Sequence, residues 1–228
     1  MANLVQTIDY GDAACSCHVF GEQGEPCLIF DFPSAKVLNY VERHHPGIAA
    51  IFLTHGHYDH ISGLNDLPDG FNVPIVFHPL DEEFFFDSRL NGSRTLFGQE
   101  FVLTKKGLSF YRCEDEDEIL PDRRQIIDEA GEKQTIGGTL VRVLHTPYHT
   151  PGSVCYYLPE QGILFSGDSL FRFGIGRSDL PGGNSRQAEA SLSRLAALPK
   201  ETIVYTGHGP KTTIGDEIRF NPYLNGRQ

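Results

Sequence analysis

Three histidines and an aspartate fall within six consecutive positions, and this cluster constrains the chain more than any other feature. The segment 54–60 (THGHYDH) directly follows the apolar run 48–53. That run predicts a short buried strand, and a helix is expected to begin near Ser62. Burying three neighbouring imidazoles without partners would be costly. The cluster therefore predicts a strand-to-helix loop whose side chains bind metal.

The spacing inside the cluster predicts two metal ions. His55 and His57 alternate, so both can face one ion, whereas Asp59 and His60 lie on the turn beyond and can face a second. An open catalytic site normally keeps three protein ligands and a water, so four ligands are too many for one such site. Imidazole and carboxylate suit borderline and harder transition metals. We expect two divalent ions, with zinc as the first choice and iron or manganese as alternatives.

Three later residues are candidates for the remaining ligands. His149 follows the predicted strand 140–144, Asp168 follows the run ILFSG, and His208 follows the run TIVY. Each stands beside glycine or proline, where the chain leaves a strand, and α/β enzymes place functional groups at such positions. Together with the first cluster, they would complete two metal sites.

The rest of the chain predicts a layered α/β architecture in one domain spanning 1–228, because strands and helices alternate in both halves. Residues 91–136 are the exception. This acidic insertion lacks a regular pattern and holds the run EDEDE at 114–118, whose like charges predict a hydrated loop or lid. Predicted strands are 25–31, 48–53, 73–77, 140–144, 154–158, 163–167 and 202–205, and predicted helices are 34–45, 81–90 and one after Asn184.

Composition excludes several classes of protein. A net charge of −11 and a pI near 5.3 argue against nucleic-acid binding, which needs a basic surface. No stretch approaches the ~20 apolar residues of a membrane span, and the N-terminal residues do not resemble a signal peptide. We therefore expect a cytoplasmic protein that acts on a small molecule, away from membranes.

The five cysteines form no Cys-x-x-Cys pair, so neither a zinc ribbon nor a redox motif is indicated. Cys15 and Cys17 alternate and would share one face of a strand. Free cysteines usually pack as small buried hydrophobes, which is the favoured interpretation here. Metal binding by this pair is the alternative.

Four motifs in order resemble the metallo-β-lactamase superfamily: HGHYDH, HTPYHTPGS, GDSLFRFGIGRSD and GHGPKTT, over residues 54–213. Within it, the chain is similar to the short glyoxalase II-like hydrolases. The resemblance implies an αββα sandwich with the metals at the sheet edges. It implies that one ion is held by His55, His57 and His149, the other by Asp59, His60 and His208, and that Asp168 bridges them.

The resemblance also implies a substrate. Arg177 matches a basic residue that glyoxalase II enzymes aim at glutathione, whereas Asp179 and Pro210 stand where those enzymes have tyrosines. Only twenty residues follow His208, so the helical domain that grips glutathione in longer relatives has no counterpart here. Tyr148 stands where the family usually has glycine, and it would be strained if that position required a positive φ.

These features together predict a dinuclear hydrolase of a thioester such as S-lactoylglutathione. By hypothesis, a hydroxide bridging the two ions attacks the carbonyl, and Asp59 orients it as the catalytic residue. The alternative is a persulfide dioxygenase with one iron on His55, His149 and Asp168, which the segment GRSD at 176–179 resembles. A lactonase or another ester hydrolase ranks below both.

Overall fold

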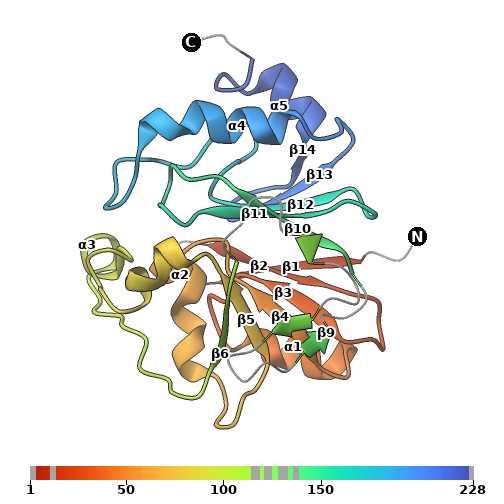
Figure 1. Cartoon of the computed structure of the whole chain (residues 1–228), viewed down its shortest axis with the longest axis vertical. Helices are drawn as coiled ribbons and strands as arrows, with labels where there is room; N and C mark the ends of the chain where they lie inside the picture. The colour runs from red at the N-terminus through yellow and green to blue at the C-terminus, as the bar shows by residue number, and fades with distance from the viewer. Residues whose placement is uncertain are drawn as a thin grey trace.

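Two six-stranded sheets stack face to face, with helices on both outer faces (Figure 1). The computed structural model describes residues 4–10, 14–113, 119–120, 125–127, 133–135 and 139–225. The first sheet has the strand order β1-β2-β3-β4-β5-β6 and the second has the order β14-β13-β12-β11-β10-β7. This is the αββα sandwich that the family resemblance implied.

The first half of the chain forms the first sheet and its helices. Its strands are β1 (Val5–Tyr10), β2 (Cys15–Phe20), β3 (Cys27–Phe30), β4 (Ile48–Phe52), β5 (Pro74–Phe77) and β6 (Ser109–Arg112). Its α-helices are α1 (Val37–His44), α2 (Tyr58–Ile61) and α3 (Ser93–Phe97), and its 3₁₀ helices are η1 (Ser62–Asp66) and η2 (Pro79–Phe85). Strands β3 to β6 run parallel, and β1 and β2 complete the sheet as an antiparallel pair.

The second half forms the second sheet. Its strands are β7 (Ile119–Leu120), β10 (Val141–His145), β11 (Val154–Leu158), β12 (Ile163–Gly167), β13 (Ile203–Thr206) and β14 (Thr212–Thr213). Its helices are η3 (Ser185–Gln187), α4 (Ala188–Ala196) and α5 (Ile214–Phe220). Strands β8 (Gln125–Ile127) and β9 (Lys133–Thr135) pair separately as a small antiparallel sheet.

Three apolar clusters lie between the four layers. The central cluster fills the space between the two sheets and includes the stacked rings of Phe30, Phe52 and Phe165. A second cluster packs the first sheet against α1 and α2, and a third packs the second sheet against α4 and α5. Burial of apolar surface on both faces of each sheet holds the sandwich together and fixes the strand ends at its edge.

The structure corrects the sequence analysis in three places. Strands β1 and β2 were not predicted; β2 is buried at every position and lacks the alternation that marks a half-exposed strand. The helix predicted over 81–90 is the shorter 3₁₀ helix η2, which begins at Pro79. The insertion predicted as irregular over 91–136 contains α3, and β6 within it extends the first sheet by pairing with β5. The acidic run 114–118 lies outside the described residues.

Candidate metal centre

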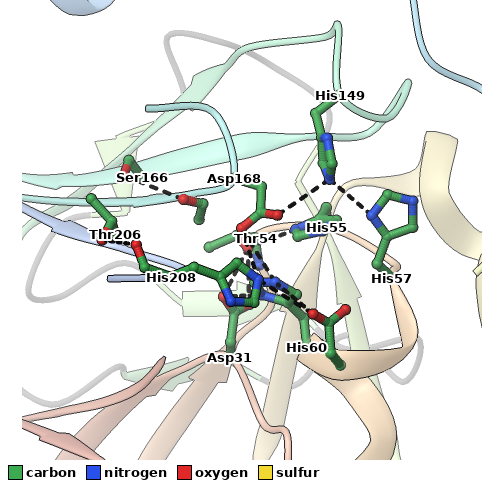
Figure 2. A network of polar contacts seen from close by, with 12 residues as sticks. Asp31, Thr54, His55, His57, His60, His149, Ser166, Asp168, Thr206 and His208 are labelled. Atoms are coloured by element: carbon green, nitrogen blue, oxygen red, sulfur yellow. Dashed lines mark hydrogen bonds and ion pairs between the residues drawn. The ribbon is translucent and has the colours of Figure 1, made fainter. Parts of the chain in front are cut away.

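The predicted ligands come from four strand ends that meet at one edge of the sandwich (Figure 2). The first cluster follows β4, Asp168 follows β12, His208 follows β13, and His149 lies in the turn after β10. These loops belong to both sheets, and backbone bonds join them at this edge. The amide of Val154 donates to the carbonyl of Thr54 at 2.9 Å, which ties the second sheet to the first beside the ligands.

His55, His57 and His149 form one group of donors. Each offers a ring nitrogen, and these nitrogens all lie within 4.8 Å of one another. The three side chains are nearly fully buried. Nδ1 of His57 lies 2.9 Å from Nε2 of His149, so two nitrogens face each other across the space between the rings. A cation is the natural partner for such a set of converging lone pairs.

Asp59, His60 and His208 form a second group beside the first. Nε2 of His208 lies 3.3 Å from Oδ2 of Asp59, and Nε2 of His60 lies 4.0 Å from the same oxygen. His60 is fully buried, whereas the side chains of Asp59 and His208 keep 17% and 27% of their surface exposed. The second group is therefore the side of the site that solvent reaches.

Asp168 lies between the two groups and faces both. Its Oδ2 is 3.5 Å from Nε2 of His149, in the first group, and its Oδ1 is 3.4 Å from Nε2 of His60, in the second. Oδ1 is also 3.6 Å from Nε2 of His208. Each oxygen of one carboxylate thus serves a different group, which is the arrangement that a bridging ligand requires.

Unsatisfied polar atoms test whether these residues fit metal ions. Among the described residues, the unpartnered buried atoms of the site include Nε2 of His55, Nε2 of His60 and Oδ1 of Asp168. Buried polar groups almost always have a partner, so these three orphaned atoms in one site need an explanation. Imidazole and carboxylate are ligands for zinc, iron and manganese. The residues fit a metal centre.

Asp31 orients ligands of both groups through a chain of hydrogen bonds. Nδ1 of His60 lies 2.8 Å from Oδ2 of Asp31, and the Thr54 hydroxyl donates to the same carboxylate at 2.9 Å. Nδ1 of His55 in turn lies 3.0 Å from the Thr54 hydroxyl oxygen. These contacts occupy Nδ1 of both histidines and leave Nε2 for a metal, as supporting residues do in metal sites. The sequence analysis did not assign this role to Asp31.

The backbone around Asp31 is adapted to this role. Asp31 adopts a φ of 59°, a left-handed conformation that aspartate tolerates better than most residues and that recurs at functional sites. Across the interface, Gly167 has a φ of 47°, and a Cβ there would lie 2.3 Å from the Thr54 hydroxyl oxygen. Only glycine allows the second sheet to approach Thr54 this closely.

Asp81 joins the loop of the first cluster to the loop of His149. This η2 residue is buried, and it accepts hydrogen bonds from the amide of Gly56 at 2.8 Å and the amide of Gly152 at 2.6 Å. The Thr150 hydroxyl donates to it at 2.7 Å. Burial raises the pKa of Asp81 to about 6, against the effect of these three donors. The carboxylate clamps together two loops that carry ligands of the first group.

His149 is oriented by the backbone of the GRSD segment. Its Nδ1 donates to the carbonyl of Arg177 at 2.6 Å. The Arg177 side chain is exposed and pairs with Asp179 at 2.6 Å, so substrate binding by Arg177 stays a prediction. Tyr148 is buried, has no positive φ, and donates its hydroxyl proton to the carbonyl of Ser169. The strain considered for tyrosine at this position is absent.

The electrostatics of the site favour a cation. Burial lowers the pKa of His57 to about 3 and that of His55 well below its ordinary value, so both rings keep free lone pairs. Burial opposes ionisation of Asp168, but the charge of His60 outweighs it and holds the pKa of Asp168 well below its usual range. Although burial disfavours its proton, neighbouring Cys15 and other acidic groups raise the pKa of His60. The neutral rings of His55 and His57 and the ionised carboxylate of Asp168 are forms that bind metal, and a metal ion on His60 would replace the proton of that ring.

Two curated relatives are similar in sequence to this chain over most of their length. The chain is 37% identical over 206 residues to YqgX of Bacillus subtilis, described as a probable metallo-hydrolase, with 89% of each chain covered. It is 33% identical over 193 residues to the hydroxyacylglutathione hydrolase GloC of Haemophilus influenzae, covering 84% of this chain and 83% of GloC.

Two solved structures are similar over the whole fold. BLEG-1, a B3 metallo-β-lactamase, superposes with a TM-score of 0.82 at 34% identity, covering 97% of this chain and all of BLEG-1. TTHA1623, solved in a di-iron-bound form, superposes with a TM-score of 0.76 at 33% identity, covering 96% of this chain and all of TTHA1623. The family model of the metallo-β-lactamase superfamily matches residues 14–208, from the residue before β2 to the last histidine of the site. The sandwich, its ligand-bearing edge and these matches together establish that the chain belongs to the metallo-β-lactamase superfamily.

Proposed function

We propose that this chain is a dinuclear metal-dependent hydrolase of a thioester such as S-lactoylglutathione. One observation carries the dinuclear assignment: the two oxygens of Asp168 face different groups of donors, with His149 on one side and His60 on the other. The thioester assignment is supported by the similarity to GloC, a hydroxyacylglutathione hydrolase.

The residues define what the two ions would do. His55, His57 and His149 would hold one ion, Asp59, His60 and His208 would hold the other, and Asp168 would contact both. When bound, such ions lower the pKa of water to about 7 and polarise an acyl carbonyl. We propose zinc as the resident metal, with iron as the first alternative because TTHA1623 binds two irons.

Asp59 and His208 are suited to meet the substrate. Both keep part of their side chains exposed, so the scissile group would enter from this side. Burial disfavours ionisation of Asp59, but the nearby charge of His60 outweighs it and lowers the pKa of Asp59. The ionised carboxylate can accept a hydrogen bond from the attacking water and orient it. A thiolate leaving group, whose conjugate thiol has a pKa of about 8.5, needs no general acid.

The persulfide dioxygenase alternative uses one iron on two histidines and one aspartate, here His55, His149 and Asp168. It gives no role to the second group, in which His60 and His208 both face Oδ2 of Asp59 and Oδ1 of Asp168. The dinuclear hydrolase accounts for both groups, and we therefore prefer it.

The test is hydrolysis of S-lactoylglutathione by the purified protein, before chelation, after chelation and after return of Zn²⁺ or Fe²⁺. We expect turnover that chelation abolishes and metal restores, with two ions counted per chain. One iron per chain with sulfite formed from a persulfide would support the dioxygenase instead. Two ions per chain without thioester turnover would refute the substrate and direct the search to lactones, esters and β-lactams.

A further inference from the structure

The thiol of Cys15 lies among the donors of the second group. Cys15 is the first residue of β2 and is fully buried. Its Sγ, a ring nitrogen of His60 and a ring nitrogen of His208 all lie within 4.8 Å of one another. Three ligand atoms spaced in this way can contact a single ion, so the thiol is within reach of the same position as the two imidazoles.

Backbone contacts fix the thiol at this place. Cys15 and His208 oppose each other in an antiparallel β-bridge, and the amide of Ser16 donates to the carbonyl of Gly207 at 2.8 Å. A Cβ at Gly207 would lie 2.3 Å from Oδ1 of Asp168, so the loop packs directly against the ligands. The backbone at the start of β2 is thus attached to the segment that presents His208. Because the cysteine side chain is short, this attachment fixes the position of the thiol.

A separate observation shows that a ligand belongs in this space. His60 is fully buried, and its Nδ1 is occupied by Asp31. Its Nε2 is buried and has no hydrogen-bond partner among the described residues. A buried nitrogen without a partner is costly, and a metal ion that replaces the proton of this ring would satisfy it.

Given the dinuclear centre proposed above, we propose that Cys15 is an additional ligand, as a thiolate, of the ion held by His60 and His208. Thiolate is a soft donor that selects zinc or iron, whereas manganese prefers oxygen ligands. A thiolate in the second group would therefore make that position discriminate against manganese. Imidazole and carboxylate ligands alone discriminate against manganese less strongly. The ion that this position would bind is a borderline divalent transition metal.

Cys17 provides a matched control. It lies two positions further along β2 and is equally buried, but it belongs to the apolar cluster between the first sheet and the helices α1 and α2. The substitution Cys17→Ser removes a buried thiol from the same strand and leaves the second group intact. Any effect of losing a thiol from β2 in general will therefore appear in both variants.

The experiment is an anaerobic titration of the protein with Co²⁺ after a chelator has removed its metal. Absorption spectroscopy monitors the titration. The visible d–d bands report binding of cobalt, and a near-ultraviolet sulfur-to-cobalt charge-transfer band reports a thiolate ligand. We expect both signals in the wild type and in Cys17→Ser, and only the d–d bands in Cys15→Ser. In Cys15→Ser, the affinity of the second position for Zn²⁺ should fall by about tenfold or more, and that for Mn²⁺ should change little.

The outcomes separate this inference from the proposed function. Two cobalt ions bound by the wild type without a charge-transfer band would overturn the role of Cys15 and leave the dinuclear hydrolase intact. A charge-transfer band that persists in Cys15→Ser would likewise overturn it. Failure to bind cobalt at all would overturn both proposals. The spectrum of the wild type decides the matter even if Cys15→Ser fails to fold.

Discussion

Oδ2 of Asp31 lies 2.8 Å from Nδ1 of His60, and this contact determines which nitrogen of the ring remains for a metal. Replacing Asp31 with asparagine would present an amide that no longer attracts the N–H of the ring so strongly. We expect Asp31→Asn to weaken binding of the second ion by about 10–100-fold. Competition with a chromophoric chelator measures this affinity. The control is Asp9→Asn, an exposed substitution on β1, which should bind metal like the wild type. If Asp31→Asn bound the second ion as tightly as the wild type does, Asp31 would not orient His60 for metal binding.

Asp168 should be needed for both ions, because its two oxygens face different groups. We expect Asp168→Asn to retain less than the full metal content and to lose roughly three orders of magnitude or more in kcat/KM, which corresponds to at least about 4 kcal/mol of transition-state stabilisation. Metal analysis and thioester kinetics measure the two effects. Asp179→Asn, an exposed substitution, is the control for metal content. A fully loaded and active Asp168→Asn enzyme would disprove bridging.

Asp81 should matter for metal binding although it is not a ligand. Its amide replacement would place an N–H group against the donors of Gly56 and Gly152. We expect Asp81→Asn to lower the free energy of unfolding by about 1–3 kcal/mol and metal affinity by about 10–100-fold. Glu82→Gln is the matched control, because Glu82 forms an exposed pair with Arg112 that is worth at most about 1 kcal/mol. Metal affinity unchanged in Asp81→Asn would show that the clamp is purely structural.

His18 should make the metal-free protein sensitive to acid. Burial lowers the pKa of His18 to about 4, whereas an unfolded histidine titrates near 6.5. Between these two values the unfolded chain binds more protons, so stability is present above pH 6.5 and is lost as the pH falls toward 4. The loss should be on the order of 3 kcal/mol. Urea denaturation at pH 7 and pH 4 measures it, and His18→Gln should lose less than the wild type. Identical losses would exclude this contribution.

Local patterns were sufficient to identify the candidate ligands that the structure brings together, but not the residues that orient them. Asp168 and His208 follow apolar strands, which is a signal within a few positions of each residue. Asp31 also follows a strand, β3, but its partners lie 23 and 29 positions away. The partner of Asp81 at Gly152 is 71 positions away. The contacts of Asp31 depend on how β3 pairs with β4, and the contact of Asp81 with Gly152 depends on how the two halves of the chain pack together. No local pattern encodes either.

The missed strands have a related explanation. β2 belongs to the first sheet, but its polar residues are buried because they meet partners on other strands. Ser16 bonds to Asp9, and Nε2 of His18 lies 3.0 Å from the carbonyl of Thr206 in β13. A strand of this kind shows no hydrophobic alternation, so its polar residues suggest a loop until the rest of the sheet is known. The Cys15 thiol belongs to this strand, and its neighbours His60 and His208 are equally distant in sequence.

The hydrogen bond from His149 to residue 177 has a consequence for how this protein can diversify. His149 uses the peptide carbonyl of that residue, and every amino acid supplies that group. The exposed side chain at the same position is therefore free to change without disturbing the ligand below it. A lineage could exchange Arg177 for another side chain, and so change the exposed surface there, without moving His149. The exposed side chain at position 177 can change during evolution while the candidate metal ligands stay in place.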